Sequence, residues 1–138
     1  MREIKFRAWD KKHKHFFDVK EFGNDGSNCW ASSKRGGYRH WNPIFVQYTG
    51  LKDKNGREIY EGDCYTAKHK SGKVYTGQVK YDLSFVFDIE GFEESFINGV
   101  GAVKTNRTFD IHSFVKWFGE VEVIGNIYED PQLLEAAE

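Results

Sequence analysis

The chain has 138 residues, a length that suits one domain with an ordinary hydrophobic core. Hydrophobic residues make up 39% of the chain and charged residues 30%, a balance that excludes a disordered protein. No apolar run approaches the roughly 18 residues that span a membrane, and the opening residues are too polar for a signal peptide. Cys29 and Cys64 are too few for a disulfide framework. We therefore expect a cytoplasmic protein with reduced thiols and no membrane contact.

The formal net charge is −1, which argues against a protein dedicated to coating nucleic acid. Its distribution is uneven. Residues 1–80 hold 17 Lys and Arg against 9 Asp and Glu, whereas residues 81–138 hold 3 against 12. In one interpretation, the two halves pair within the fold, so that acidic strands face basic ones. The other places opposite charges on separate faces, which favours head-to-tail self-association or one basic binding surface. The sequence leaves both interpretations open.

The chain opens with a predicted hairpin. Apolar and charged residues alternate over residues 4–8, which is typical of a half-buried strand. Residues 10–13 predict a turn into a second short strand over residues 15–19. Glycine, serine and asparagine are frequent in the stretch that follows, and we expect a flexible loop near residues 23–40.

The central part of the chain predicts several further strands. One covers residues 44–48 and is followed by the clearest turn in the sequence, Asn55-Gly56, because this pair tolerates a positive φ. Another strand is expected over residues 64–69. Strict alternation then dominates residues 74–89, where the apolar positions are Val79, Tyr81, Leu83, Phe85, Phe87 and Ile89. This pattern predicts a long strand or a bent hairpin arm with one face in the core.

The last third of the chain is more varied. Residues 90–108 contain three glycines and predict a turn-rich excursion. A strand also fits residues 110–118, but we favour a short helix there, N-capped by Asp110 and ended by Gly119. Its apolar face would consist of Ile111, Phe114, Val115 and Phe118.

Two final elements follow this helix. A last strand is expected over residues 121–127, with Gly125 at a bulge. Asp130-Pro131 predicts the start of a terminal helix over residues 132–137. Many short strands with little helix predict an all-β protein, either a small barrel or a folded antiparallel sheet, with a short C-terminal helix. We expect a single domain over residues 1–138.

Two groups of side chains raise the question of a metal site. His13 and His15 would share one face of a strand, but the lysines around them repel a cation. Glu58, Glu61 and Asp63 could hold magnesium for phosphodiester chemistry, although turn formation is the simpler role. We predict no catalytic residue, no metal, no cofactor and no small-molecule substrate. A metal-dependent enzyme acting on nucleic acid is the alternative.

Basic residues interleaved with aromatic ones give the candidate binding surface. Such residues can neutralise phosphates and stack on bases. The candidates are Arg2, Lys5, Arg7, Trp9 and Arg39. In the competing interpretation, the aromatic residues belong to the core and the cations are solvated. Phe6 and Trp9 have opposite parity, so at most one of them faces the core of a regular strand.

Three segments carry a resemblance to a known family. They are residues 47–63 (QYTGLKDKNGREIYEGD), residues 1–10 (MREIKFRAWD) and residues 122–131 (EVIGNIYEDP). In order and spacing the chain resembles the YopX family of phage and prophage proteins. The resemblance implies a small, mostly β protein in the cytoplasm of a bacterial host cell. It supplies no enzymatic activity and no catalytic residues, and glycines such as Gly50, Gly56 and Gly62 have structural reasons to be where they are.

These observations together predict a non-enzymatic accessory protein of phage origin that binds a macromolecule. The opposed charges of the two halves favour a protein partner or a homo-oligomer. Nucleic acid, bound through the basic N-terminal half, is the second choice.

Overall fold

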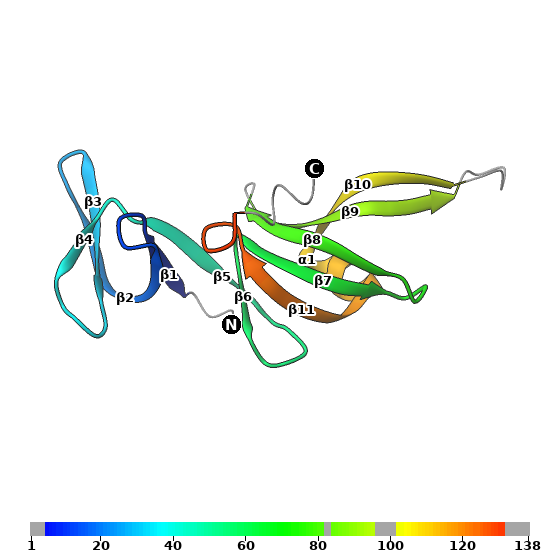
Figure 1. Ribbon diagram of the computed structural model, residues 1–138, viewed down its shortest axis with the longest axis horizontal. Helices are drawn as coiled ribbons and strands as arrows, with labels where there is room; N and C mark the ends of the chain where they lie inside the picture. Colours follow the sequence, from blue (N-terminus) through cyan, green and yellow to red (C-terminus); the bar gives the residue numbers. More distant parts are fainter. Residues whose placement is uncertain (1–4, 82–83, 96–101, 132–138) are drawn as a thin grey trace. The chain divides into compact units, whose positions relative to one another are not determined.

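The computed structural model describes residues 5–81, 84–95 and 102–131. The chain divides into two compact units, unit 1 from Met1 to Gly50 and unit 2 from Leu51 to Glu138, where the sequence predicted a single domain. Figure 1 shows the strands of unit 1 in blue and cyan, and those of unit 2 in green to orange. One strand, β5, continues across the boundary between the units.

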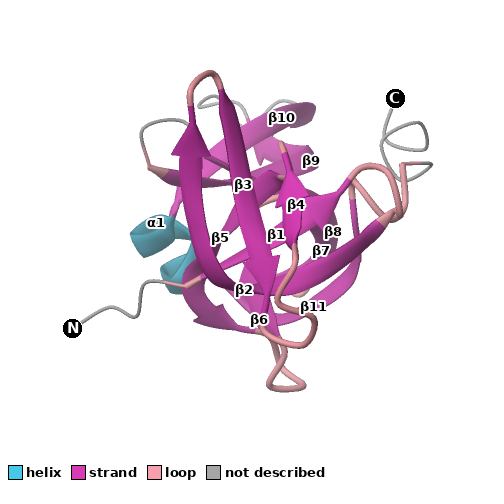
Figure 2. Ribbon diagram, turned by 90° about the vertical axis from the view of Figure 1, so that its left-hand side faces the viewer, coloured by secondary structure: helices cyan, strands magenta, loops and turns pink. Residues whose placement is uncertain are grey.

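Unit 1 is a sheet built from consecutive strands of the first third of the chain. Its strand order is β4-β3-β2-β1-β5, and β6 follows β5 in the same sheet. Figure 2 shows β2 and β3 as a long antiparallel pair. The strands of unit 1 are β1 (Phe6–Asp10), β2 (His15–Asp25), β3 (Asn28–Ser33), β4 (Arg39–Trp41) and β5 (Ile44–Lys52), whereas β6 (Glu58–Tyr60) belongs to unit 2.

The predicted hairpin at the start of the chain is confirmed by the pairing of β1 with β2. The predicted loop near residues 23–40 is wrong, because β2 runs on to Asp25 and β3 and β4 occupy most of the rest. Gly26 adopts a φ of +66° and makes a tight turn between β2 and β3. The Gly, Ser and Asn residues thus build turns between strands, and the ring of Trp30 packs over the bare Cα of Gly23.

The core of unit 1 is small. Ala8, Phe17 and Ala31 are buried together, and Val19 and Phe45 pack against them. Each of the first three comes from a different one of the adjacent strands β1, β2 and β3. Two of these three buried residues are alanines, so the core contains little side-chain volume.

Unit 2 contains a five-stranded antiparallel sheet of order β10-β9-β8-β7-β11. Its elements are β7 (Asp63–His69), β8 (Val74–Tyr81), β9 (Phe85–Ser95), β10 (Ala102–Asp110), α1 (Ile111–Trp117) and β11 (Phe118–Asn126). The long alternating stretch, predicted as a long strand or a bent hairpin arm, is instead divided into two strands, β8 and β9, which pair antiparallel with each other. The prediction of turns over residues 90–108 is wrong, because β9 and β10 pair there through to Ser95 and Ala102. The pairing of β9 with β10 is irregular at one point, where the register shifts between Thr105 and Arg107.

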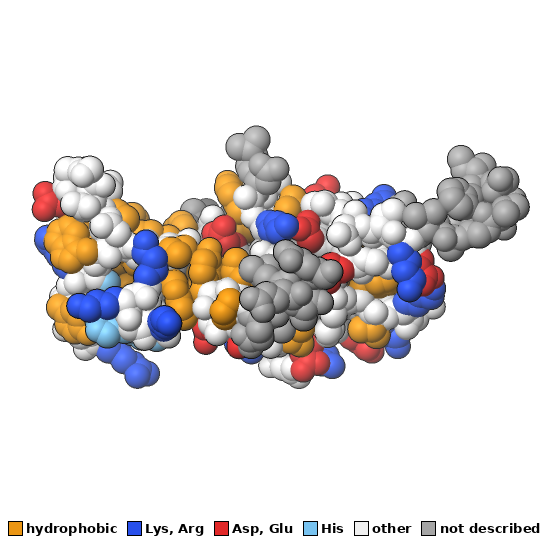
Figure 3. All heavy atoms as spheres, turned by 45° about the horizontal axis from the view of Figure 1, so that its top comes forward, with side chains coloured by type: hydrophobic (Ala, Val, Ile, Leu, Met, Phe, Trp, Pro, Cys, Tyr) orange, Lys and Arg blue, Asp and Glu red, His pale blue; other side chains and the backbone are white. Residues whose placement is uncertain are grey.

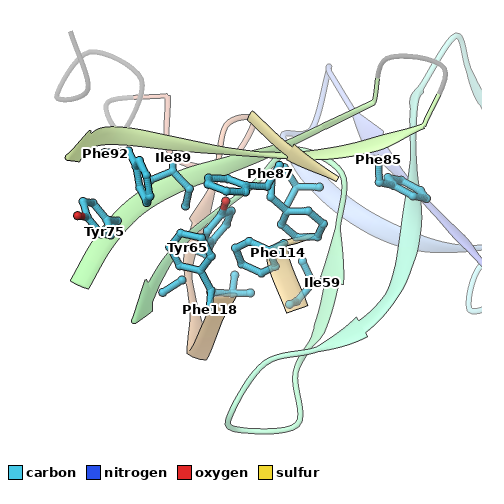
Figure 4. Close-up of a cluster of buried hydrophobic side chains, with 13 residues drawn as sticks. Ile59, Tyr65, Tyr75, Phe85, Phe87, Ile89, Phe92, Phe114 and Phe118 are labelled. Carbon is cyan, nitrogen blue, oxygen red and sulfur yellow. The ribbon is translucent and has the colours of Figure 1, made fainter. Parts of the chain in front are cut away.

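Aromatic side chains fill the core of unit 2, as Figure 4 shows. Phe114 of α1 stacks on Phe87 of β9, with ring centroids 4.2 Å apart and an interplanar angle of 11°. Tyr65 of β7 contacts both rings edge-on. The hydroxyl of Tyr65 leaves this apolar cluster by donating a 2.8 Å hydrogen bond to the backbone oxygen of Asp88.

The predicted short helix is confirmed. Its N-cap is Asp110, whose Oδ1 accepts a 2.7 Å hydrogen bond from the backbone N–H of Ser113. Val115 departs from the predicted apolar face, since 56% of it is exposed. Gly125 lies at the predicted bulge, where the pairing of β11 with β7 shifts register. The predicted terminal helix over residues 132–137 lies outside the described residues.

The observed architecture confirms the predicted all-β class with a short helix. Of the two predicted forms, the sheets match folded antiparallel sheets, because neither closes into a barrel within the described residues. None of the helical residues that the structure describes forms a segment long and apolar enough to cross a membrane.

Candidate functional site

Unit 1 carries an open cleft of about 730 Å³. It lies between the first half of β2, the segment that joins β3 to β4, and β4 itself. Its charged and titratable lining consists of three cations (Arg7, Lys34, Arg35), two histidines (His15, His40) and one carboxylate (Asp18). The aromatic lining consists of Phe16, Phe17 and Tyr38.

The register of β2 explains why a cleft opens at this place. Residues 15–18 pair with β1, whereas residues from Val19 onward pair with β3. Where the β3 pairing ends, Lys34 donates its backbone N–H to the oxygen of Asp18 at 3.2 Å, and the chain then turns away. Gly37, with a φ of +79°, completes this turn before β4 begins.

Asp10, at the end of β1, organises the histidines beside the cleft. Its carboxylate is buried, and Oδ2 accepts hydrogen bonds from Nδ1 of His40 at 2.7 Å and Nδ1 of His13 at 2.9 Å. Oδ1 accepts the backbone N–H groups of Lys12 and His13. Burial raises the pKa of Asp10, but the hydrogen bonds from His13, His40 and Lys12 outweigh it and hold this pKa well below its usual range.

His40 is consequently fixed in both position and tautomer. Its Nδ1 carries the proton donated to Asp10, so Nε2 is the nitrogen without a proton in the neutral ring. The ring lies between Phe17, at a centroid distance of 4.2 Å, and Tyr38, at 4.9 Å. The cleft thus has a rigid aromatic wall.

The electrostatic character of the cleft is positive. Lys34 and Arg35 are exposed, and the guanidinium of Arg7 lies 4.1 Å from the centroid of the Phe16 ring. Figure 3 shows Lys, Arg and His side chains gathered with exposed hydrophobic side chains over unit 1, at the left of the view. Three cations against one carboxylate favour an anionic ligand.

Of the predicted binding residues, Arg7 lines the cleft. Trp9 is only 7% exposed and packs against Phe16 at 4.8 Å, whereas Phe6 is 37% exposed. The expectation that at most one of the two aromatic residues faces the core is therefore confirmed.

The other predicted binding residues are dispersed. Lys5 is half-buried, just before β1. Arg39 is exposed on β4, where its guanidinium stacks over Trp30 at 4.0 Å and does not line the cleft. Arg2 lies outside the described residues.

Sequence reasoning missed most of the cleft. Lys34 and Arg35 could have been found, because two adjacent cations beside Gly36-Gly37 indicate a turn that presents positive charge. The pairing of Asp10 with His40 spans 30 residues and has no local signal.

The family-like segments have a structural role in unit 2. Oδ2 of Asp53 accepts a hydrogen bond from the backbone N–H of Val123 at 3.0 Å, and Oδ1 of Asp63 accepts one from Nδ2 of Asn126 at 2.9 Å. Burial raises the pKa of Asp53, but the hydrogen bonds from the backbone N–H groups of Val123, Arg57 and Asn55 outweigh this effect. The pKa is therefore lower than its usual value. The two segments therefore hold each other in place.

Backbone conformation explains the glycines of the same segments. Gly50, Gly56 and Gly62 all have positive φ, at +92°, +82° and +89°. This confirms the predicted structural reason for each. Both oxygens of Asp63 are engaged, since Oδ2 also accepts the backbone N–H of Tyr60 at 2.8 Å. Across residues 5–81, 84–95 and 102–131, no three His, Cys, Asp or Glu side chains are grouped to hold a metal ion.

Comparison with known proteins identifies a family and a similar solved structure. A family model described as YopX protein matches residues 5–135. The crystal structure of protein EF1440 from Enterococcus faecalis is similar at 24% sequence identity and a TM-score of 0.56, covering 97% of this chain and 99% of the other. That likeness concerns the fold. A search of curated proteins found no match.

Proposed function

Because the chain belongs to the YopX family, we propose that it is a phage or prophage accessory protein that acts as a non-enzymatic binding module. Its binding site is the cleft of unit 1, and its ligand is an anionic macromolecule. The observation that carries this proposal is the lining of the cleft, where Arg7, Lys34 and Arg35 face only one carboxylate, Asp18.

The wider charge of unit 1 supports the same proposal. Residues 1–50 hold ten Lys and Arg against five Asp and Glu, so the cleft lies in the positive part of the chain. A positive field raises the association rate of an anionic partner and makes its affinity depend on salt.

The test is a binding titration across a series of salt concentrations. The probe is a fluorescently labelled mixed-sequence oligonucleotide, and anisotropy reports binding. We expect saturable binding that weakens with salt, with a slope of about 0.7 per phosphate contact for a single strand. The double variant Lys34→Glu/Arg35→Glu should lose binding and lower this slope.

A matched control separates the cleft from net charge. Lys11→Glu/Lys12→Glu makes the same change of charge in unit 1, on two exposed residues of the β1–β2 turn that do not line the cleft. It should bind nearly as well as the wild type. Equal losses in the two variants would reject the cleft as the binding site.

Self-assembly is the second candidate function, and charge separation is the observation that favours it. Residues 51–138 hold ten Lys and Arg against 16 Asp and Glu, so the two units carry opposite net charge. Opposite charges on two surfaces support head-to-tail contacts between copies. Light scattering would then give a mass above 16.1 kDa at low salt that falls as salt is added. A salt-independent monomer mass would reject this candidate.

A further inference from the structure

The rings along the cleft wall form a column that ends in solvent. Phe17 and His40 stack at 4.2 Å with an interplanar angle of 26°, and His40 and Tyr38 follow at 4.9 Å and 31°. Phe17 and His40 are each 8% exposed, whereas Tyr38 is 64% exposed. The column therefore has a buried end and an open end, and Tyr38 is the open end.

A hydrogen bond from His40 to Asp10 holds the column rigid. Asp10 accepts the Nδ1 proton of His40 at 2.7 Å and is itself fixed by the backbone N–H groups of Lys12 and His13. Tyr38 also lies beside Gly36, where a Cβ would come within 3.0 Å of an atom of the tyrosine ring. A preorganised flat surface loses little entropy when another flat group stacks on it.

Two cations lie close to Tyr38 in the sequence. Lys34 and Arg35 precede Tyr38 in the segment between β3 and β4, and all three line the cleft together with Arg7. An aromatic platform beside cations is the combination that binds single-stranded nucleic acid, because the cations hold phosphates while the ring stacks on a base.

The exposed ring in the cleft favours a single strand over a duplex. A volume of about 730 Å³ lies within the range of sites that enclose small molecules. A nucleotide unit fits such a space, whereas a duplex keeps its bases paired and stacked. Only an unpaired base can present its flat face to Tyr38.

We propose that the ligand of the cleft is single-stranded nucleic acid, with an unpaired base stacked on Tyr38 and the adjoining phosphates against Lys34 and Arg35. This inference rests on the proposed function and adds to it the class of ligand and the means of recognition.

The experiment compares three probes at one salt concentration: a labelled single-stranded DNA oligonucleotide, its duplex, and linear polyphosphate as a competitor without bases. We expect the single strand to bind more tightly than the duplex and polyphosphate to compete poorly. Tyr38→Ala should weaken single-strand binding by about 5- to 150-fold, the range of one base stack. Tyr38→Phe should preserve binding, because it keeps the ring.

Salt dependence and a control variant make the test specific. Tyr38→Ala removes a ring and no charge, so it should leave the salt slope unchanged, whereas Lys34→Glu/Arg35→Glu should lower it. Tyr81→Ala, which removes an exposed tyrosine of β8 in unit 2, should not affect binding. Circular dichroism melting curves confirm that each variant is folded.

The outcomes separate the two proposals. Equal affinity for single strand and duplex, or unchanged binding by Tyr38→Ala, would overturn the stacking inference while an anion-binding cleft stands. Failure of all three polyanions to bind the wild type at low salt would reject the proposed function itself.

Discussion

Asp10 is the residue that holds the histidine of the cleft wall in place. One buried carboxylate accepts hydrogen bonds from two histidine side chains and two backbone N–H groups. We expect Asp10→Asn to lower the free energy of unfolding at pH 7 by about 1–3 kcal/mol, the value of hydrogen bonds to a charged group. Urea unfolding followed by circular dichroism measures this change.

The same carboxylate predicts a dependence on pH. The pKa of Asp10 is lower in the folded chain than in the unfolded one, so its stabilisation is complete above the unfolded value of about 4. The stabilisation is lost as the pH falls from there towards the folded pKa. The difference in unfolding free energy between wild type and Asp10→Asn should therefore be smaller at pH 3 than at pH 7. An unchanged difference would contradict the assignment, and Asp25→Asn, at an exposed position, serves as the control.

Gly77 illustrates a constraint that sequence reasoning did not detect. It lies in β8 opposite Ile89, and a Cβ at this position would collide with the backbone oxygen of Asp88 and the hydroxyl of Tyr65. Gly77→Ala should destabilise unit 2 by about 1–3 kcal/mol, as overpacking does. The matched control is Gly119→Ala in β11, where a Cβ meets nothing within 4 Å and the melting temperature should hardly change. A shift of similar size in both variants would argue against the collision.

Among the elements, α1 is bound to its unit by one side chain above all. Phe114 is the buried residue of this helix and stacks on Phe87. Phe114→Ala should cost about 3–5 kcal/mol, because it leaves a cavity in the aromatic core. Val115→Ala, on the exposed side of the same helix, should change the unfolding free energy by less than about 0.5 kcal/mol. Comparable losses from the two substitutions would contradict the observed packing.

The contrast between elements explains what the sequence could predict. The helix was predictable because its signals are local, namely the cap at Asp110 and the spacing of Phe114 and Phe118. The strand conformation of β8 and β9 was predictable from their alternation, but their division into two strands was not, because the alternation continues across the boundary. The strands over residues 23–40 were not, because β3 and β4 owe their conformation to hydrogen bonds with neighbouring strands.

The candidate site was less predictable than the fold for a related reason. Arg7 was recognised from its strand, but its neighbours in the cleft come from residues 15–18 and 33–40. Arg7 and His40 are 33 residues apart in the sequence. Whether they line the same cleft depends on the register between strands, which alternation does not encode. The parity of Phe6 and Trp9 was predictable because it is a property of one strand alone.

At the scale of the whole molecule, the strand β5 crosses the boundary between the units, because Ile44 to Gly50 belong to unit 1 and Leu51 and Lys52 to unit 2. We therefore expect one cooperative unfolding transition, in agreement with the single domain that the sequence predicted. Urea unfolding would be followed by far-ultraviolet circular dichroism and by tryptophan fluorescence, to which Trp9 contributes from unit 1. Midpoints that coincide would support one domain, and separate midpoints would establish two.

The position of β11 in its sheet has a consequence for the timing of folding. All strands from β1 to β5 come from the first 52 residues, so the growing chain can assemble them early during synthesis. β7, in contrast, receives β11 as its second neighbour only after residues 118–126 have been made. Until then β7 is an open edge beside an aromatic core, the kind of edge on which other chains can pair. Ribosomes that stall before residue 118 would thus release the form of this protein most prone to aggregate.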